Sequence, residues 1–182
     1  RLRRTEDAIE LLRLSVELVP ENTQAWEQLE KLLSKAQRYE SLADLYADRA
    51  ELGDADERLA TLRKLAELID QHLMDRHRAV VVWQDIIELS PDDEQAEERL
   101  CDLYVSEGDW TSLDALYGGR GRWQQLVDVL ATAAASLTDA VEICSLYERM
   151  ASICRSELND TTAANACLER ILQIDPAHYQ AS

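Results

Sequence analysis

Residues 81–91, VVWQDIIELSP, decide the fold, because two other segments repeat their pattern. LLRLSVELVP ends at Pro20 and ACLERILQIDP ends at Pro176. In all three segments small or apolar residues lie 12, 8, 4 and 2 positions before the proline, a spacing that follows one face of an α-helix. The sets are Ala8, Leu12, Val16 and Leu18; Ala79, Trp83, Ile87 and Leu89; and Ala164, Leu168, Leu172 and Ile174.

The three prolines are separated by gaps of 71 and 85 residues, each about two units of roughly 35 residues. A second repeat confirms this period within the sequence: RYESLADLY at 38–46 matches DWTSLDALY at 109–117. Helical hairpins repeated at this length predict an all-α fold, an α-solenoid of antiparallel helical hairpins. The expected helices cover residues 5–19, 23–36, 39–52, 55–73, 76–89, 93–106, 110–117, 122–136, 139–157 and 161–174, with a last one starting near 178.

The repeat resembles the tetratricopeptide family, as a degenerate array of bacterial type. Its second helix opens on a small residue, followed by a large and an aliphatic one and a closing proline: Ala79, Trp83, Ile86 and Pro91. Ala164, Leu168, Ile171 and Pro176 match in the same way. One departure is Glu30, which stands where the family has a small residue. The resemblance implies a right-handed superhelix whose groove binds peptide or protein segments.

The domain prediction is one array over residues 1–182, read as a fragment of a longer protein because the chain lacks an initial Met. The expected hairpins are 1–20 (second helix only), 21–53, 54–91, 92–118, 119–137 (an irregular insertion), 138–176 and 177–182 (the start of another repeat).

The formal net charge of −17 restricts the class of partner. Nucleic-acid binding requires Lys and Arg to neutralise phosphates, so nucleic acid is not expected. Binding to anionic membranes and insertion into a membrane are likewise not expected. Residues 92–98, DDEQAEE, hold five carboxylates, which favour either a solvated helix start or a docking patch for a basic partner.

The four cysteines are predicted to be buried free thiols, because each lies at an apolar helical position and no CxxC pair is present. They are Cys101, Cys144, Cys154 and Cys167. Free thiols favour a reducing compartment, so a cytoplasmic location is expected, with a periplasmic one left open.

Two segments resemble chemical sites only weakly. Asp70, His72, Asp75 and His77 could hold a metal, but the histidines are five apart across a turn rather than four apart on one helix face. The loop GGRGR at 118–122 lacks the lysine of a phosphate-binding loop, and a helix end followed by a turn is expected there. No catalytic residue, cofactor or metal is predicted, and the chain is interpreted as non-enzymatic.

The four tryptophans have two interpretations, core packing or exposed anchors for a partner. Trp26 and Trp83 match core positions, and Trp110 and Trp123 open helices after a turn.

The leading functional hypothesis is a protein-interaction scaffold that binds a basic or amphipathic peptide or protein segment. The resemblance implies that the first helix of each hairpin lines the groove. The alternatives are a structural spacer, a self-associating scaffold of unknown oligomeric state, and the partner-sensing arm of an enzyme. The predicted groove residues are Gln24, Glu27, Lys31, Lys35, Gln95, Glu98, Asp102 and Ser106. Glu94, Glu98 and Asp102 follow one line at intervals of four, which favours a cationic partner.

Overall fold

The computed structural model describes residues 2–176, and within them the chain forms ten α-helices and one π-helical turn, without a strand. This confirms the all-α prediction, while the helix expected near 178 lies outside the described residues. The elements are α1 (Leu2–Leu18), α2 (Thr23–Lys35), α3 (Tyr39–Leu52), α4 (Ala55–Leu68), η1 (Ile69–Leu73), α5 (Arg76–Leu89), α6 (Glu94–Glu107), α7 (Trp110–Gly118), α8 (Trp123–Ser136), α9 (Ala140–Ser156) and α10 (Thr161–Ile174).

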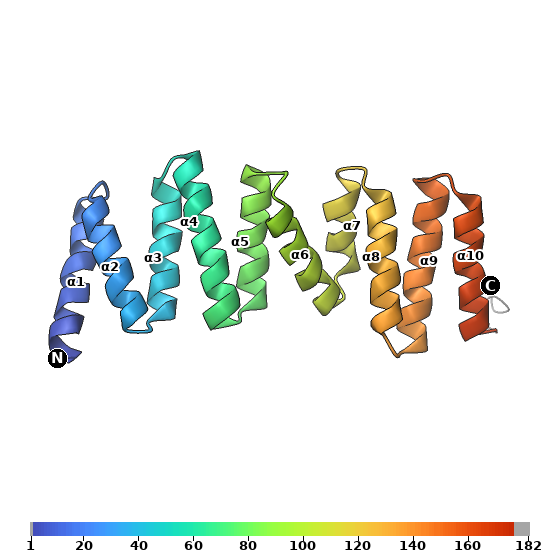
Figure 1. Cartoon of the computed structure of the whole chain (residues 1–182), viewed down its shortest axis with the longest axis horizontal. Coiled ribbons are helices and arrows are strands. Elements are labelled where there is room, and N and C mark those ends of the chain that lie inside the picture. The colour runs from blue at the N-terminus through green and yellow to red at the C-terminus, as the bar shows by residue number, and fades with distance from the viewer. Residues whose placement is uncertain (1, 177–182) are drawn as a thin grey trace. The chain divides into compact units, whose positions relative to one another are not determined.

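The chain divides into two compact units, Arg1–Leu103 and Tyr104–Ser182, with the boundary inside α6. Within each unit, consecutive helices run in opposite directions and pack on one another, as α1 to α5 and α7 to α10 show in Figure 1. Each unit is therefore a stack of antiparallel helical hairpins, as in an α-solenoid. The predicted single array over 1–182, its hairpin bounds and the right-handed superhelix stay predictions.

Helix starts are determined by short polar side chains. Asp54 accepts hydrogen bonds from the backbone N–H groups of Asp56 and Glu57, and Asp139 accepts them from Val141 and Glu142. These bonds satisfy N–H groups that a helix leaves without an internal partner. The helices expected to begin at residues 55 and 139 begin at Ala55 and Ala140, so both predicted starts are confirmed to within one residue.

The core follows the apolar stripes of the helices. Trp83 is 1% exposed, and Ala79 and Ile86 are buried on the same helix. Trp26 is also buried, and its indole N–H donates to the Pro20 carbonyl oxygen at 2.8 Å. The core interpretation is therefore correct for both tryptophans.

The last position of the repeated pattern, two residues before each proline, is not buried with the other positions. Leu18 is 80% exposed, and Leu89 and Ile174 are each 37% exposed. A helix turns about 100° per residue, so a residue ten positions after the first has rotated to the edge of the buried stripe. Leu172 is also exposed, and Leu168 is half-buried rather than fully buried like its counterpart Trp83.

Glu30 is partly buried on α2, between polar partners from α3 and α4. It accepts a hydrogen bond from the Tyr46 hydroxyl at 3.0 Å and one from the Lys64 ammonium at 3.1 Å. Burial and the charge of Glu30 raise the pKa of the Tyr46 hydroxyl, which keeps it protonated as a donor. The three residues link α2, α3 and α4.

Ion pairs connect helices two apart in the chain. Arg38 pairs with Glu6 at 2.6 Å, and Arg78 pairs with Glu40 at 2.7 Å, which connects the start of α3 to α1 and α5 to α3. Lys64 joins α4 to α2 through Glu30. Long side chains therefore bridge alternate helices of the first unit, whereas the close backbone contacts are between consecutive helices.

Gly118 allows the turn between α7 and α8 to close. A Cβ atom at this position would lie 2.8 Å from Cζ3 of Trp123 and closer still to its Cη2 atom. Trp123 therefore packs over the end of α7 at the junction of the hairpin, and Gly119 follows as the C-cap. The helix end predicted from GGRGR is confirmed.

Replacing Trp83 with Ala is expected to lower the free energy of unfolding by about 3–5 kcal/mol, as large-to-small core changes do. Val81→Ala, on the exposed face of the same helix, is the matched control and should change it by less than about 0.5 kcal/mol. Urea denaturation of both variants measures the difference, and a loss below about 1 kcal/mol for Trp83→Ala would contradict the core assignment.

Replacing Gly118 with Ala is expected to cost about 1–3 kcal/mol, because the new methyl group overlaps the Trp123 ring. The cost should disappear when Gly118→Ala is introduced into a Trp123→Ala background. Thermal melts of the four proteins in this cycle measure the coupling. An equal cost in both backgrounds would mean that Gly118 is needed for its backbone rather than for the indole ring.

Candidate functional site

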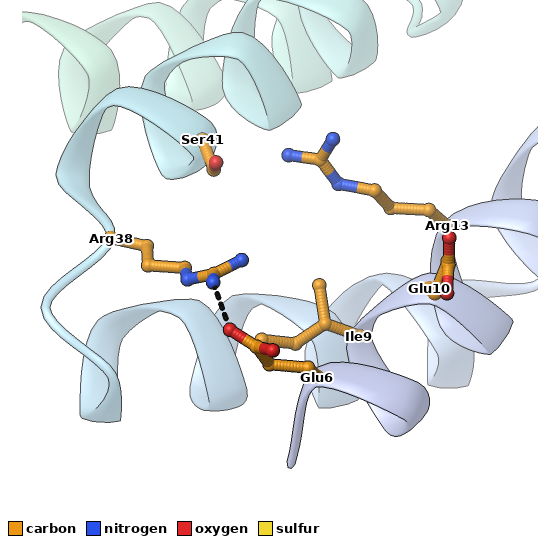
Figure 2. Close-up of a pocket in the computed structure, with 6 residues that line it drawn as sticks. All are labelled: Glu6, Ile9, Glu10, Arg13, Arg38 and Ser41. Carbon is orange, nitrogen blue, oxygen red and sulfur yellow. Dashed lines mark hydrogen bonds and ion pairs between the residues drawn. The ribbon is translucent and has the colours of Figure 1, made fainter. Parts of the chain in front are cut away.

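The candidate site is a groove lined mainly by side chains of α1 and α3, which the ion pair of Arg38 with Glu6 bridges at one end. Its first part is a hollow of about 340 Å³ lined by six residues, shown in Figure 2: Glu6, Ile9, Glu10, Arg13, Arg38 and Ser41. Arg13 and Arg38 extend into this hollow from opposite sides, and Ile9 contributes an apolar side chain between them.

A second hollow of about 90 Å³ shares Arg13 and Ser41 with the first and extends the groove along the same two helices. Buried apolar side chains lie at its base: Val16 of α1, Leu29 of α2 and Leu45 of α3. Three carboxylates, Glu17, Asp44 and Asp48, also line it. The groove therefore combines an apolar floor with an acidic rim.

The charges of the groove do not balance. Its two hollows are lined by five carboxylates and two guanidinium groups, so three negative charges are left over. Burial, together with the charges of Asp44 and Glu51, raises the pKa of Asp48 above its ordinary value, and Arg13 opposes that shift only in part. A cation placed beside Asp48 would relieve this repulsion.

The eight predicted groove residues lie on two other helices. Gln24, Glu27, Lys31 and Lys35 lie on the exposed face of α2, and the other four, Gln95, Glu98, Asp102 and Ser106, are exposed on α6. Within these sets, Glu27 and Lys31 are 4.0 Å apart, and Asp102 lies 3.6 Å from Arg99. None of the eight lines the two hollows.

The acidic segment 92–98 is in part structural. Asp93 accepts a hydrogen bond from the backbone N–H of Ala96 at the start of α6, and its other oxygen pairs with Arg63 at 2.5 Å. Burial opposes ionisation of Asp93, but the bonds from Arg63 and Ala96 outweigh it and lower the pKa of this carboxyl group. Asp92, Glu94 and Glu98 are exposed, so these three carboxylates of the segment face solvent.

The residues considered as metal ligands have separate roles. Asp70 accepts hydrogen bonds from the Trp83 indole and from Arg99, and Asp75 accepts one from the backbone N–H of Arg78 at the start of α5. The His72 ring stacks on Tyr39, with ring centroids 3.9 Å apart. Residues 2–176 contain no group of three or more His, Cys, Asp and Glu side chains arranged to hold a metal ion.

The tryptophans that open helices and the cysteines also have defined places. Trp110 is half-buried, and its carbonyl oxygen accepts a hydrogen bond from Arg149 at 3.2 Å. All four cysteines are free; Cys144 and Cys154 are buried as predicted, whereas Cys101 and Cys167 are only partly buried. No helix among the described residues has the length and apolar character needed to cross a membrane.

Comparison with known proteins finds similarity only among solved structures, since no family model and no curated protein matches the chain. The chain is similar to YrrB, described as a TPR protein with an unusual peptide-binding site, at 14% identity over 99% of this chain and 82% of that one, with a TM-score of 0.40. It is also similar to BtubC (BKLC) from P. vanneervenii, at 15% identity over 97% and 90% of the two chains, with a TM-score of 0.37. The helical-repeat assignment of this chain rests on its own helices and their packing.

Sequence reasoning missed the groove residues Arg13, Glu17, Asp44 and Asp48. The family resemblance directed attention to α2 and α6, whereas the groove lies between α1 and α3, which the predicted hairpin bounds count as second helices. Asp44 and Asp48 are four positions apart, which places them on one face of a helix. The same spacing occurs on many helices of this acidic chain, so it could not identify the groove.

Replacing Asp93 with Ala is expected to lower the free energy of unfolding by about 0.5–2 kcal/mol at neutral pH, as loss of a helix cap does. Because its pKa is lower in the folded state, the contribution of Asp93 is complete above the ordinary Asp pKa and disappears as the pH falls through the folded value. Urea denaturation at several pH values should show the difference from wild type shrinking in acid.

The matched control for this prediction is Asp92→Ala, which alters the exposed neighbouring carboxylate. It should change stability by less than about 0.5 kcal/mol at every pH. Equal losses for the two variants would mean that general charge, rather than the bonds to Ala96 and Arg63, accounts for the effect.

Proposed function

We propose that this chain is a non-catalytic protein-interaction module whose α1–α3 groove binds a peptide or protein segment carrying Lys or Arg beside apolar residues. The observation that carries the proposal is the groove itself, in which unbalanced carboxylates surround an apolar floor. Nucleic acid is not a proposed partner, because the groove and the whole chain are acidic. We also propose a cytoplasmic location, consistent with the four free thiols.

The binding mode follows from the lining of the groove. An ammonium or guanidinium group would lie among Glu17, Asp44 and Asp48, where it would offset their mutual repulsion. The apolar neighbours of that cation would cover Val16 and Leu45. Electrostatic complementarity of this kind accelerates association and selects the partner, and apolar contact supplies affinity.

The predicted residues on α2 and α6 form a second proposed surface. Glu94, Glu98 and Asp102 lie at intervals of four on α6, so their carboxylates repel one another and would also attract a cationic segment. This surface lacks the hollow and the apolar floor that the α1–α3 groove has, so the groove is the preferred site.

A self-associating scaffold is a second candidate function, supported by an apolar face on α1. Leu11, Leu14 and Leu18 are all exposed, and spacings of three and four place them on one side of this helix. Sedimentation velocity over a range of concentrations tests it. A monomer at every concentration, with and without Leu14→Glu, would eliminate self-association through this face.

Binding to the groove is tested with a fluorescently labelled peptide of alternating Lys and Leu, measured by fluorescence polarisation. The double variant Asp44→Lys and Asp48→Lys should weaken binding about tenfold or more, because each reversed charge removes an attraction and adds a repulsion of about 0.2–1 kcal/mol. Affinity should also fall with added salt, and as the pH is lowered toward the Asp48 pKa, since protonation removes its charge.

The control is the matched double variant Glu98→Lys and Asp102→Lys, which makes the same change of charge on α6. It should alter affinity by less than about twofold at moderate salt, because screening limits the reach of a surface charge to about 10 Å. If this variant abolishes binding and the groove variant does not, the partner binds on α6. Equal effects of both variants would show attraction to the net charge rather than to the groove.

A further inference from the structure

Cys154 of α9 and Cys167 of α10 face each other within the second unit. Their thiols are in hydrogen-bonding contact, and Cys167 packs against the buried cluster of Ala151, Cys154 and Ala164. The two residues are 13 positions apart and lie on consecutive helices, so a bond between them would link α9 to α10. This juxtaposition has no part in the groove or in the proposed function.

The two thiols differ in their access to solvent. Cys154 is 1% exposed, whereas Cys167 is only partly buried. A small oxidant in solution therefore reaches Cys167 first. Cys154 is shielded from the oxidant, but the sulfur of Cys167 is in contact with it.

We propose that Cys154 and Cys167 form a modification site, at which a hydroperoxide converts the two thiols into an intramolecular disulfide between α9 and α10. The Cys167 thiolate attacks a peroxide oxygen, the O–O bond breaks, and Cys167 becomes a sulfenic acid as the first water is released. The Cys154 thiolate then attacks the Cys167 sulfur, the S–S bond forms, the S–O bond breaks, and the departing hydroxide takes up a proton as the second water. With hydrogen peroxide as the oxidant, two thiols and one peroxide molecule thus give one disulfide and two waters.

The surroundings of the two thiols determine how fast they are oxidised. Burial raises the pKa of Cys154, and the charge of Asp160 adds to that rise; burial and the neighbouring Cys154 raise the pKa of Cys167. The thiolate is the reactive form, so oxidation is slow at neutral pH and accelerates as the pH rises. Such a pair responds to sustained rather than brief exposure to oxidant.

The disulfide would restrict the hairpin of α9 and α10. The disulfide requires the two sulfur atoms to approach to a bond length of about 2.05 Å. A cross-link between residues 154 and 167 limits the conformations open to the unfolded chain, which stabilises the folded hairpin. Oxidation therefore stiffens the second unit and leaves the groove of the first unit unchanged.

Peptide mapping tests the proposal, because trypsin places each cysteine in a separate peptide. The folded wild-type chain is treated with hydrogen peroxide, its remaining thiols are alkylated, and the digest is analysed by mass spectrometry with and without a reductant. Peptides 150–155 and 156–170 should appear linked, two hydrogens lighter than their sum, and should separate on reduction. A disulfide involving Cys101 or Cys144, a bond between two chains, or sulfinic acid at Cys167 without a link would overturn the proposal.

Two variants test the order of the steps. In Cys154→Ser the sulfenic acid of Cys167 has no partner, so dimedone labelling of Cys167 should rise several-fold over wild type. In Cys167→Ser, Cys154 should stay unmodified, and Cys144→Ser should form the disulfide as wild type does. Dimedone labelling of Cys154 in Cys167→Ser or in Cys144→Ser would contradict the assigned order, and the wild-type map remains decisive even where a variant folds poorly.

Discussion

The packing of each apolar stripe against the neighbouring helices is the constraint on which the rest of this structure depends. Trp83 illustrates it, since its ring is buried in the α4–α5 hairpin while its indole N–H donates to Asp70 in the turn that joins those helices. Asp70 in turn accepts from Arg99 of α6, so one buried ring connects the packing of one hairpin to the next helix. Because each stripe is covered mainly by neighbours in the chain, each hairpin must present a similar surface to the next one.

Polar contacts between alternate helices determine which carboxylates are already paired and which could bind a cation from a partner. Glu6, Glu30 and Asp93 are in ion pairs with Arg38, Lys64 and Arg63, although all three belong to an acidic chain with an excess of carboxylates. Asp44 and Asp48 lie instead where two side-by-side helices leave an open hollow above apolar side chains. A net charge of −17 describes the whole chain, but only the placement of individual carboxylates indicates where a cation would bind.

The two units have different chemical character. The first contains the acidic groove, in which non-covalent binding of a cationic segment is proposed. The second contains the thiol pair, in which covalent oxidation would alter the stability of a hairpin. The helical hairpin, a single structural unit, thus supports two unrelated kinds of site through different side chains on its surface.

The amino-acid sequence by itself determined the all-α class, the positions of the helices to within a few residues, and core residues such as Trp26 and Trp83. These follow from local rules, since helical periodicity, an aspartate at a helix start and a proline after a helix end act over a few positions. The tertiary structure decided what depends on residues far apart in the chain. Leu18 is exposed although it completes the repeated pattern, and Glu30 is tolerated because Tyr46 and Lys64 reach it. Arg13 of α1 and Asp48 of α3 line one hollow although 35 positions separate them in the chain. Residue spacing records which side chains share one helix face, whereas the partner of that face is determined only when the helices pack in three dimensions.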